Sequence, residues 1–466
     1  MADLAQPLDP AAADAAAFLD SVQGNILKSH GRDHTAHVFV RFNASQAAAR
    51  GWCAELASGA VVSASVQEAQ TRAWRADNES SALFLGLLLS ADGYLALGVE
   101  TIPPDPLFAA GMQRHNEVSP DPINDTLPTA WEPGYAAGVD AMLLLAHDDR
   151  PTLDAALSDH LARLPSPGSQ AFVERGDRTT FAFGVHGKQD IEHFGHQDGI
   201  SNPLMTLPEI EKERARRGAR HWDPAASLSL VFIREPGQAA GFGSYMVFRK
   251  LEQNVRRFRS ARAALAQALG CSEEEASGLI VGRRSDGTPL ISTETPDVSA
   301  DPNDFDYGSD SPAAPGPAGV CPFHAHIRRS NPRGDTVSYL GAPTTDFERG
   351  MRIVRRGVTY GARPDLGGVG EPPEKDVGLL FMSFQANLRQ FAIQQSGADS
   401  ADFPSDGAGL EGLNGRTAEG GDPAPQSWPT ASGPILFSLG GFVTLKGGEY
   451  LFAPSLPFLK SLALPG

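Results

Sequence analysis

The strongest constraint on the fold of this chain is that its apolar residues come in short runs, each bounded by polar or turn-forming residues. Runs of this length predict strands that are buried on one or both faces. They occupy residues 37–42, 82–89, 141–146, 228–233, 245–248 and 377–384. No run reaches the roughly 18 apolar residues that a membrane-spanning helix needs, so we expect no membrane partner.

Helical patterns follow several of these strands. Periodic apolar residues predict helices over 154–164 and 253–269, and Ser272 with Glu275 forms a capping-box sequence that predicts a further helix start. In each half of the chain a strand is followed by a tight break and then by such a helix. The pattern predicts an α+β protein with two similar halves.

Charged and flexible sequences separate these elements. The charged segment 207–225 predicts a solvated helix face between two domains, residues 1–215 and 216–466. The chain has 49 Gly and 36 Pro residues, which predicts abundant loops. An acidic Pro- and Gly-rich stretch, 295–319, predicts a long surface loop, and 399–429 also lacks periodicity.

The charge and cysteine content limit the partners and the compartment. With 39 Lys and Arg against 56 Asp and Glu, the net charge is −17, which opposes binding to nucleic acid. Three cysteines are too few and too scattered for a disulfide framework or a four-cysteine zinc site. The N-terminus lacks the cationic and apolar regions of a signal peptide, so we expect a cytoplasmic protein.

Three segments concentrate reactive side chains. Residues 193–203 place Asp198 between glycines in a turn, and residues 321–333 place two histidines before three arginines. Each is weak evidence alone, because Asp-Gly is usually only a turn and buried histidines often only pack. In 351–361, apolar residues alternate with arginines, and a buried arginine is costly unless an anion meets it.

The residues alone leave more than one chemistry open. A dinuclear metal site of a hydrolase could use the histidines and the aspartate of these segments, which are His193, His196, His324, His326 and Asp198. No phosphate-binding loop, dinucleotide fingerprint or Gly-x-Ser-x-Gly sequence is present, so nucleotide binding and common serine-hydrolase chemistry have no support.

The conjunction of motifs resembles the dye-decolorizing peroxidase family of haem proteins, in the branch of the fungal enzymes and their bacterial relatives. The matches are Gly195-x-x-Asp198-Gly199, His326 within His-Ile-Arg-x-x-Asn-Pro-Arg, and Arg355 within Arg-Arg-Gly-x-x-Tyr-Gly. Segments 23–27, 377–385 and 447–455 also look like family segments, so the resemblance covers nearly the whole chain.

The resemblance implies a fold and an activity. The fold would be two ferredoxin-like domains with antiparallel sheets, and the C-terminal domain would hold most of one haem b. The reaction would be the H2O2-dependent oxidation of phenolic, aromatic and dye-type donors through a ferryl intermediate, by a monomer or a homodimer. The main alternative is a haem-handling or iron-releasing protein on the same scaffold, and Asp198 with Arg355 argues against it.

The resemblance also implies roles for individual residues. His326 would be the proximal iron ligand, with Glu411 as its carboxylate partner where the family usually has aspartate. Cys321 as a thiolate ligand is the competing possibility. Asp198 would be the distal acid–base residue, and Arg355 would hold the peroxide. The remaining expectations concern the haem contacts Gly199, Ile200 and Ser201, the distal wall Leu379 and Phe381, the propionate partner Arg333 and a surface electron relay, Tyr360.

Overall fold

The structure is a computed structural model that describes residues 2–77, 82–184, 187–217, 221–238, 241–290, 303–307, 321–341, 345–403, 407–417, 425–428 and 433–463. The strands are β1 His34–Arg41, β2 Phe84–Leu89, β3 Ala141–His147, β4 Gln170–Asp177, β5 Thr180–Ala182, β6 Lys188–Asp190, β7 Ile233–Arg234, β8 Phe242–Gln253, β9 Val354–Arg355, β10 Val358–Tyr360, β11 Gly378–Gln385, β12 Gln426–Trp428, β13 Ile435–Phe437 and β14 Val443–Ala453.

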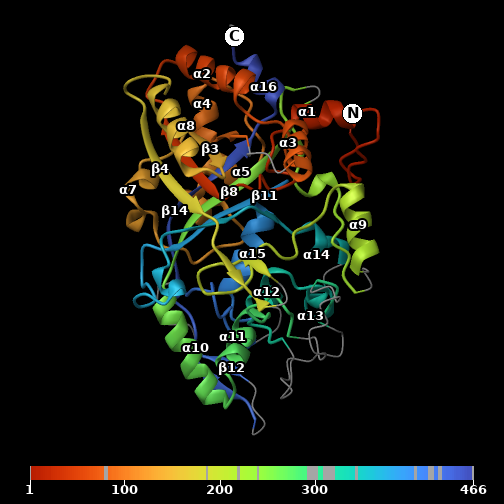
Figure 1. Ribbon diagram of the computed structural model, residues 1–466, viewed down its shortest axis with the longest axis vertical. Coiled ribbons are helices and arrows are strands. Elements are labelled where there is room, and N and C mark those ends of the chain that lie inside the picture. Colours follow the sequence, from red (N-terminus) through yellow and green to blue (C-terminus); the bar gives the residue numbers. More distant parts are fainter. Residues whose placement is uncertain are drawn as a thin grey trace.

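Helices alternate with these strands along the chain (Figure 1). The helices are α1 Ala15–Ser21, α2 Gln46–Gly59, α3 Ala64–Asp77, α4 Ala91–Ala96, α5 Pro106–Ala110, α6 His115–Val118, α7 Pro133–Ala136, α8 Arg150–Ala162, α9 Leu207–Arg217, α10 Val255–Leu269, α11 Glu273–Val281, α12 His326–Ser330, α13 Asp335–Leu340, α14 Thr345–Gly350, α15 Arg389–Asp399 and α16 Leu456–Ser461.

The main sheet has ten strands, eight of which form two four-stranded antiparallel units placed edge to edge, while β7 pairs with β8 and β9 pairs with β11. Its strand order is β10-β11-β8-β14-β2-β3-β1-β4, so the first four strands come from the second half of the chain and the last four from the first half. Within each unit, strands taken in chain order are arranged 2-3-1-4, with helices in the two crossovers. This is the ferredoxin-like βαββαβ arrangement, and the two units meet where Phe452 of β14 pairs with Leu89 of β2.

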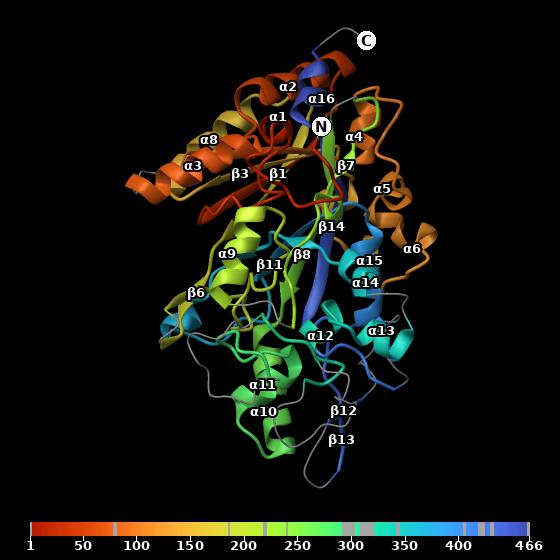
Figure 2. The same cartoon turned by 90° about the vertical axis from the view of Figure 1, so that its right-hand side faces the viewer.

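Helices cover both faces of the sheet. In Figure 2, α2, α3 and α8 lie on one side of the first-half strands, and α4, α5 and α6 lie on the other. Strands β2 and β3 are therefore buried at every residue, which explains their continuous apolar sequences. Helices α1 and α16 contact each other at the end of the molecule opposite α10 and α11 (Figures 1 and 2).

Most of the predicted elements are confirmed, because local signals act together with burial there. Ser272 and Glu275 form the reciprocal capping box that starts α11. The predicted strand at 228–233 is wrong: Leu228–Leu230 is a 3-10 turn, and only Ile233–Arg234 is strand. The N–H groups of Val231 and Phe232 donate to the Leu228 carbonyl, so this apolar run satisfies its backbone as a buried turn.

The two loop predictions have different outcomes. Only 303–307 of the segment 295–319 lies within the described residues, and there Phe305 and Tyr307 are buried rather than on the surface. The described parts of 399–429 include β12 and a turn that carries Glu411.

Among the described residues, no helix is both long and apolar enough to cross a membrane. The domain boundary at 215/216 stays a prediction.

Candidate active site

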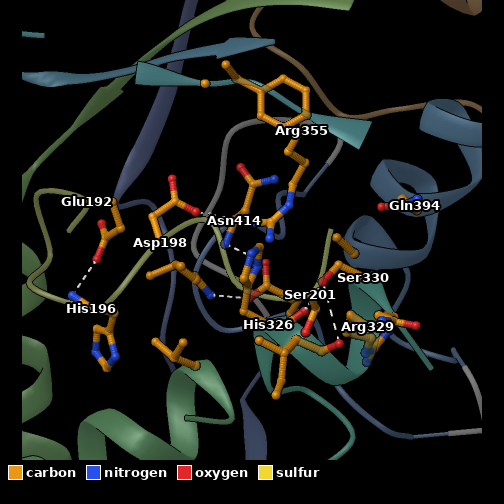
Figure 3. Close-up of a pocket in the computed structure, with 18 of the residues that line it drawn as sticks. Glu192, His196, Asp198, Ser201, His326, Arg329, Ser330, Arg355, Gln394 and Asn414 are labelled. Carbon is orange, nitrogen blue, oxygen red and sulfur yellow. Dashed lines mark hydrogen bonds and ion pairs between the residues drawn. The ribbon is translucent and has the colours of Figure 1, made fainter. Parts of the chain in front are cut away.

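A cavity collects side chains from parts of the chain that are far apart in sequence. Its lining includes the turn around Asp198, strands β8, β9 and β11, helices α12 and α15, and the loop that carries Glu411. Figure 3 shows the side chains of Asp198, His326 and Arg355 converging on this space. Segments that are far apart in sequence thus form one site.

His326 begins α12 and stands in front of a buried carboxylate. Its Nδ1 lies 3.6 Å from Oε1 of Glu411, which is completely buried. Glu411 is held in place by its own turn, because the backbone N–H groups of Leu413 and Asn414 donate to its two oxygens at 2.7 and 2.6 Å. Burial alone would lower the pKa of His326, but the Glu411 carboxylate outweighs it and raises that pKa. Nε2 is the nitrogen left to bind a metal in the cavity.

Asp198 and Arg355 form the opposing polar pair. Oδ1 of Asp198 lies 3.5 Å from Nη1 of Arg355 and accepts the Gly199 N–H at 2.6 Å. Arg355, in β9, also donates through Nη2 to the Ile200 carbonyl at 2.6 Å, and its backbone N–H donates to Asn202 at 3.0 Å. Gly199 has φ +78°, a left-handed conformation that suits glycine and turns the chain tightly after Asp198.

Arg333 and Ser201 lie together at another part of the lining. Both residues have left-handed backbone conformations. Nη2 of Arg333 donates to Oγ of Ser201 at 3.1 Å, and Nη1 donates to the carbonyls of Asn303 and Phe305 at 2.6 and 2.5 Å. The guanidinium also stacks 3.8 Å from the Phe305 ring centre. The buried part of the acidic loop therefore positions this arginine.

Leu379 and Phe381 form part of an apolar wall. They are alternate residues of β11, so their side chains lie on the same face of the sheet, and both line the cavity. Leu251 of β8, the register partner of Leu379, lines the cavity beside them. The wall comes from the ordinary two-residue periodicity of neighbouring strands.

Sequence reasoning missed most of the cationic lining. Beside Arg333 and Arg355, the cavity is lined by Arg249, Arg283, Arg329 and Arg352. Burial lowers the pKa of Arg283 and of Arg352 to about 9 and of Arg329 to about 10. Of these four arginines, only Arg329 and Arg352 lie in the motif-bearing segments 321–333 and 351–361. Arg249 lies in a strand whose sequence carries no motif. Such a cluster favours an anionic ligand.

Glu192 is another candidate functional residue of the cavity that no sequence motif indicated. It lines the cavity and accepts the backbone N–H groups of Phe194 at 2.7 Å and His196 at 2.9 Å. Burial raises its pKa against these hydrogen bonds. Six residues before Asp198, it places another carboxyl group in the same lining.

The cavity suits a haem by the chemistry of its donors. One imidazole backed by a carboxylate suits an iron. The apolar wall suits a porphyrin ring, and the group of arginines suits its two propionates. Cys321 does not fit as a ligand, because burial raises the pKa of its thiol to about 12 and it is not among the lining residues.

Two expectations need correction. The alternative of a dinuclear metal site finds no support, because no group of three or more His, Cys, Asp or Glu side chains within the described ranges could hold a metal. His193 contacts the Tyr360 carbonyl, His196 contacts Ser277 and His324 packs on Trp428. Tyr360 is not on the surface, since only 8% of it is exposed. Its strand pairs with β11, and Lys250 lies over its ring.

Comparisons with known proteins identify the family of this chain. No family model matches the chain. The "Multifunctional dye peroxidase DyP2" of an Amycolatopsis species is 38% identical, over 97% of both chains. The "Dye-decolorizing peroxidase msp1" of Mycetinis scorodonius is 29% identical, over 81% of this chain and 76% of its own.

A solved structure has a similar fold. A DyP-type peroxidase of Anabaena superposes with a TM-score of 0.85 at 34% identity, covering 96% of this chain and 95% of its own. The ferredoxin-like arrangement is thus common to both proteins. Because the identity to the Amycolatopsis protein extends over nearly the full length of both chains, this chain belongs to the dye-decolorizing peroxidase family.

Proposed function

We propose that the protein is a haem b peroxidase, with one haem per chain, that uses H2O2 to oxidise phenolic, aromatic and dye-type donors. The observation that carries the proposal is that one cavity holds both the His326–Glu411 pair and the Asp198–Arg355 pair. In this proposal, the first pair is the ligand site for iron, and the second pair is the proton-transfer site for peroxide.

The holding residues follow from the lining. Nε2 of His326 would bind the iron, and Glu411 would increase the basicity of that ring. Leu379 and Phe381 would pack on the porphyrin, and Arg333 would meet a propionate. When bound, the haem supplies an iron that accepts peroxide and takes up and returns single electrons.

The chemistry of the protein side chains is proton transfer and charge stabilisation. Oδ1 of Asp198 faces Arg355 and Gly199, so Oδ2 is the oxygen left to take a proton from H2O2 and return it to the departing oxygen as water forms. The Arg355 guanidinium would stabilise the negative charge that develops as the O–O bond breaks. The apolar wall limits the water that would screen this charge.

Three variants test the assignment. His326→Ala should lose the Soret band of the purified protein. Asp198→Ala and Arg355→Leu should keep the band and lose peroxide turnover. A haem-handling protein would keep the band and show little turnover even without substitution, so a wild-type Soret band that does not respond to H2O2 would overturn the peroxidase assignment.

The role of Tyr360 as an electron relay stays a prediction, and the residue would relay electrons from a buried position. Tyr360→Phe should slow the oxidation of large dyes while leaving small phenols unaffected, because only large donors are excluded from the cavity. Equal effects on both donor classes would contradict the relay.

A further inference from the structure

Tyr450 is a buried tyrosine whose hydroxyl group has a base already in place. It lies in β14, is completely buried, and its hydroxyl is 2.6 Å from Nδ1 of His115. Nε2 of the same ring lies 3.1 Å from the Asp121 carbonyl oxygen. A carbonyl oxygen can only accept a hydrogen bond, so Nε2 carries the proton and Nδ1 accepts from Tyr450. His115 is therefore a neutral ring oriented to receive the phenolic proton.

The pair lies between the cavity and the molecular surface. Tyr450 pairs with Val247 of β8, and Arg249, two residues further along β8, lines the cavity. Alternate residues of a strand share a face, so Tyr450 and Arg249 lie on the same side of the sheet. On the other side of the pair, His115 begins the short helix α6, whose next three residues are exposed. Figure 2 shows α6 at the outside of the molecule.

Two other oxidisable side chains near the site have different surroundings. The Tyr360 hydroxyl is buried and has no hydrogen-bond partner within the part of the chain that the structure describes. Trp222 lies under the guanidinium groups of Arg333, Arg349 and Arg352, at 5.1, 5.3 and 5.8 Å from its ring. Three cations oppose the removal of an electron from that ring. Tyr360 has no base to take up its phenolic proton, so it would pass an electron on without storing the oxidising equivalent.

We propose that Tyr450 and His115 form a redox site that holds one oxidising equivalent of the peroxidase cycle outside the haem cavity. Tyr450 loses one electron to the peroxide-oxidised haem, and its hydroxyl proton moves to Nδ1 of His115. The products are a neutral tyrosyl radical and an imidazolium. A phenolic or aromatic donor near α6 then returns one electron, and the proton returns from His115. This inference rests on the proposed peroxidase function.

Burial supports the resting state of the pair. It lowers the pKa of His115, although the hydrogen bond to the Asp121 carbonyl acts in the opposite direction. The ring is thus neutral and able to accept a proton when the cycle begins. The positive charge that it then gains lies beside the backbone carbonyl of Asp121.

Freeze-quenched electron paramagnetic resonance of the haem-loaded protein after H2O2 tests the proposal. Wild type should give a tyrosyl radical whose signal narrows when the tyrosines are ring-deuterated. The signal should disappear in Tyr450→Phe and remain in Tyr360→Phe and in Trp222→Phe. In His115→Gln the amide oxygen can still accept the hydrogen bond but cannot hold the proton, so the signal should also disappear.

The Soret band distinguishes a failure of the peroxidase function from a failure of the redox site. A protein without a peroxide-responsive Soret band fails as a peroxidase. A responsive band with no tyrosyl signal in wild type, or with a signal that survives in Tyr450→Phe or in His115→Gln, overturns the redox site alone. If Tyr450→Phe does not fold, the deuterated wild type and His115→Gln decide the question.

Discussion

Asp125 is a buried carboxylate whose loss should destabilise the folded state. Its Oδ1 accepts hydrogen bonds from both Arg249 and Arg416, and the three side chains are 10%, 2% and 11% exposed, respectively. Arg249 lines the cavity, and Arg416 lies five residues after Glu411 in the same loop. The carboxylate thus connects a strand of the sheet to the loop behind His326.

Asp125→Asn removes one charge and leaves two buried guanidinium groups without it. Removing one partner of a buried ion pair costs about 3–5 kcal/mol. At ~2.1 cal/mol/K per residue, the unfolding entropy of 466 residues is about 1 kcal/mol/K. The melting temperature should therefore fall by about 3–5 °C.

An exposed ion pair of the same chemistry provides the control. Asp154 and Arg175 lie 2.5 Å apart, but their side chains are 46% and 41% exposed. Asp154→Asn should cost at most about 1 kcal/mol, or about 1 °C, because water screens this pair. Scanning calorimetry of both variants compares them, and 1 M salt should leave the Asp125 effect largely unchanged. Equal melting temperatures for the two variants would refute the reasoning.

Three further outcomes follow from buried groups. Burial raises the pKa of Glu449 to about 7, above its value in the unfolded chain. The folded state therefore loses stability as the pH rises from the unfolded pKa to the folded pKa. Glu449→Gln should raise the melting temperature at pH 8 and leave it unchanged at pH 4. Glu411→Gln removes the carboxylate behind His326 and should weaken haem binding by about 10- to 100-fold, measured by titrating the apoprotein with haem. Glu192→Gln removes a carboxyl group that acts less strongly on that ring than Glu411 does, so it should change haem affinity much less.

The fold was largely predictable because local and global signals agree in it. Short apolar runs became β1, β2, β3, β8 and β11, and the capping box began α11. The strand predicted at 228–233 was wrong because a short apolar run does not distinguish a buried strand from a buried turn. The edge-to-edge joining of two four-stranded units through a β14–β2 contact had no local signal at all.

The candidate site was predictable only where residues carry a motif. Asp198, His326 and Arg355 lie in recognisable segments, and the structure brings all three to one cavity. Arg249 and Glu192 line the same cavity without a motif, since a buried charge in a strand or turn resembles a solvated one in sequence.

By itself, the sequence determined the α+β class, the main strands and the residues that mark the family. It did so because periodicity, capping and motif spacing are local properties of a chain. Only the tertiary structure decided which charges are buried together and which hydroxyl groups meet a base. Tyr450 and Tyr360 are both buried tyrosines of β-strands, yet one hydroxyl meets His115 and the other meets no partner in the described chain. That difference depends on contacts between residues hundreds of positions apart, where packing determines which polar atoms can pair.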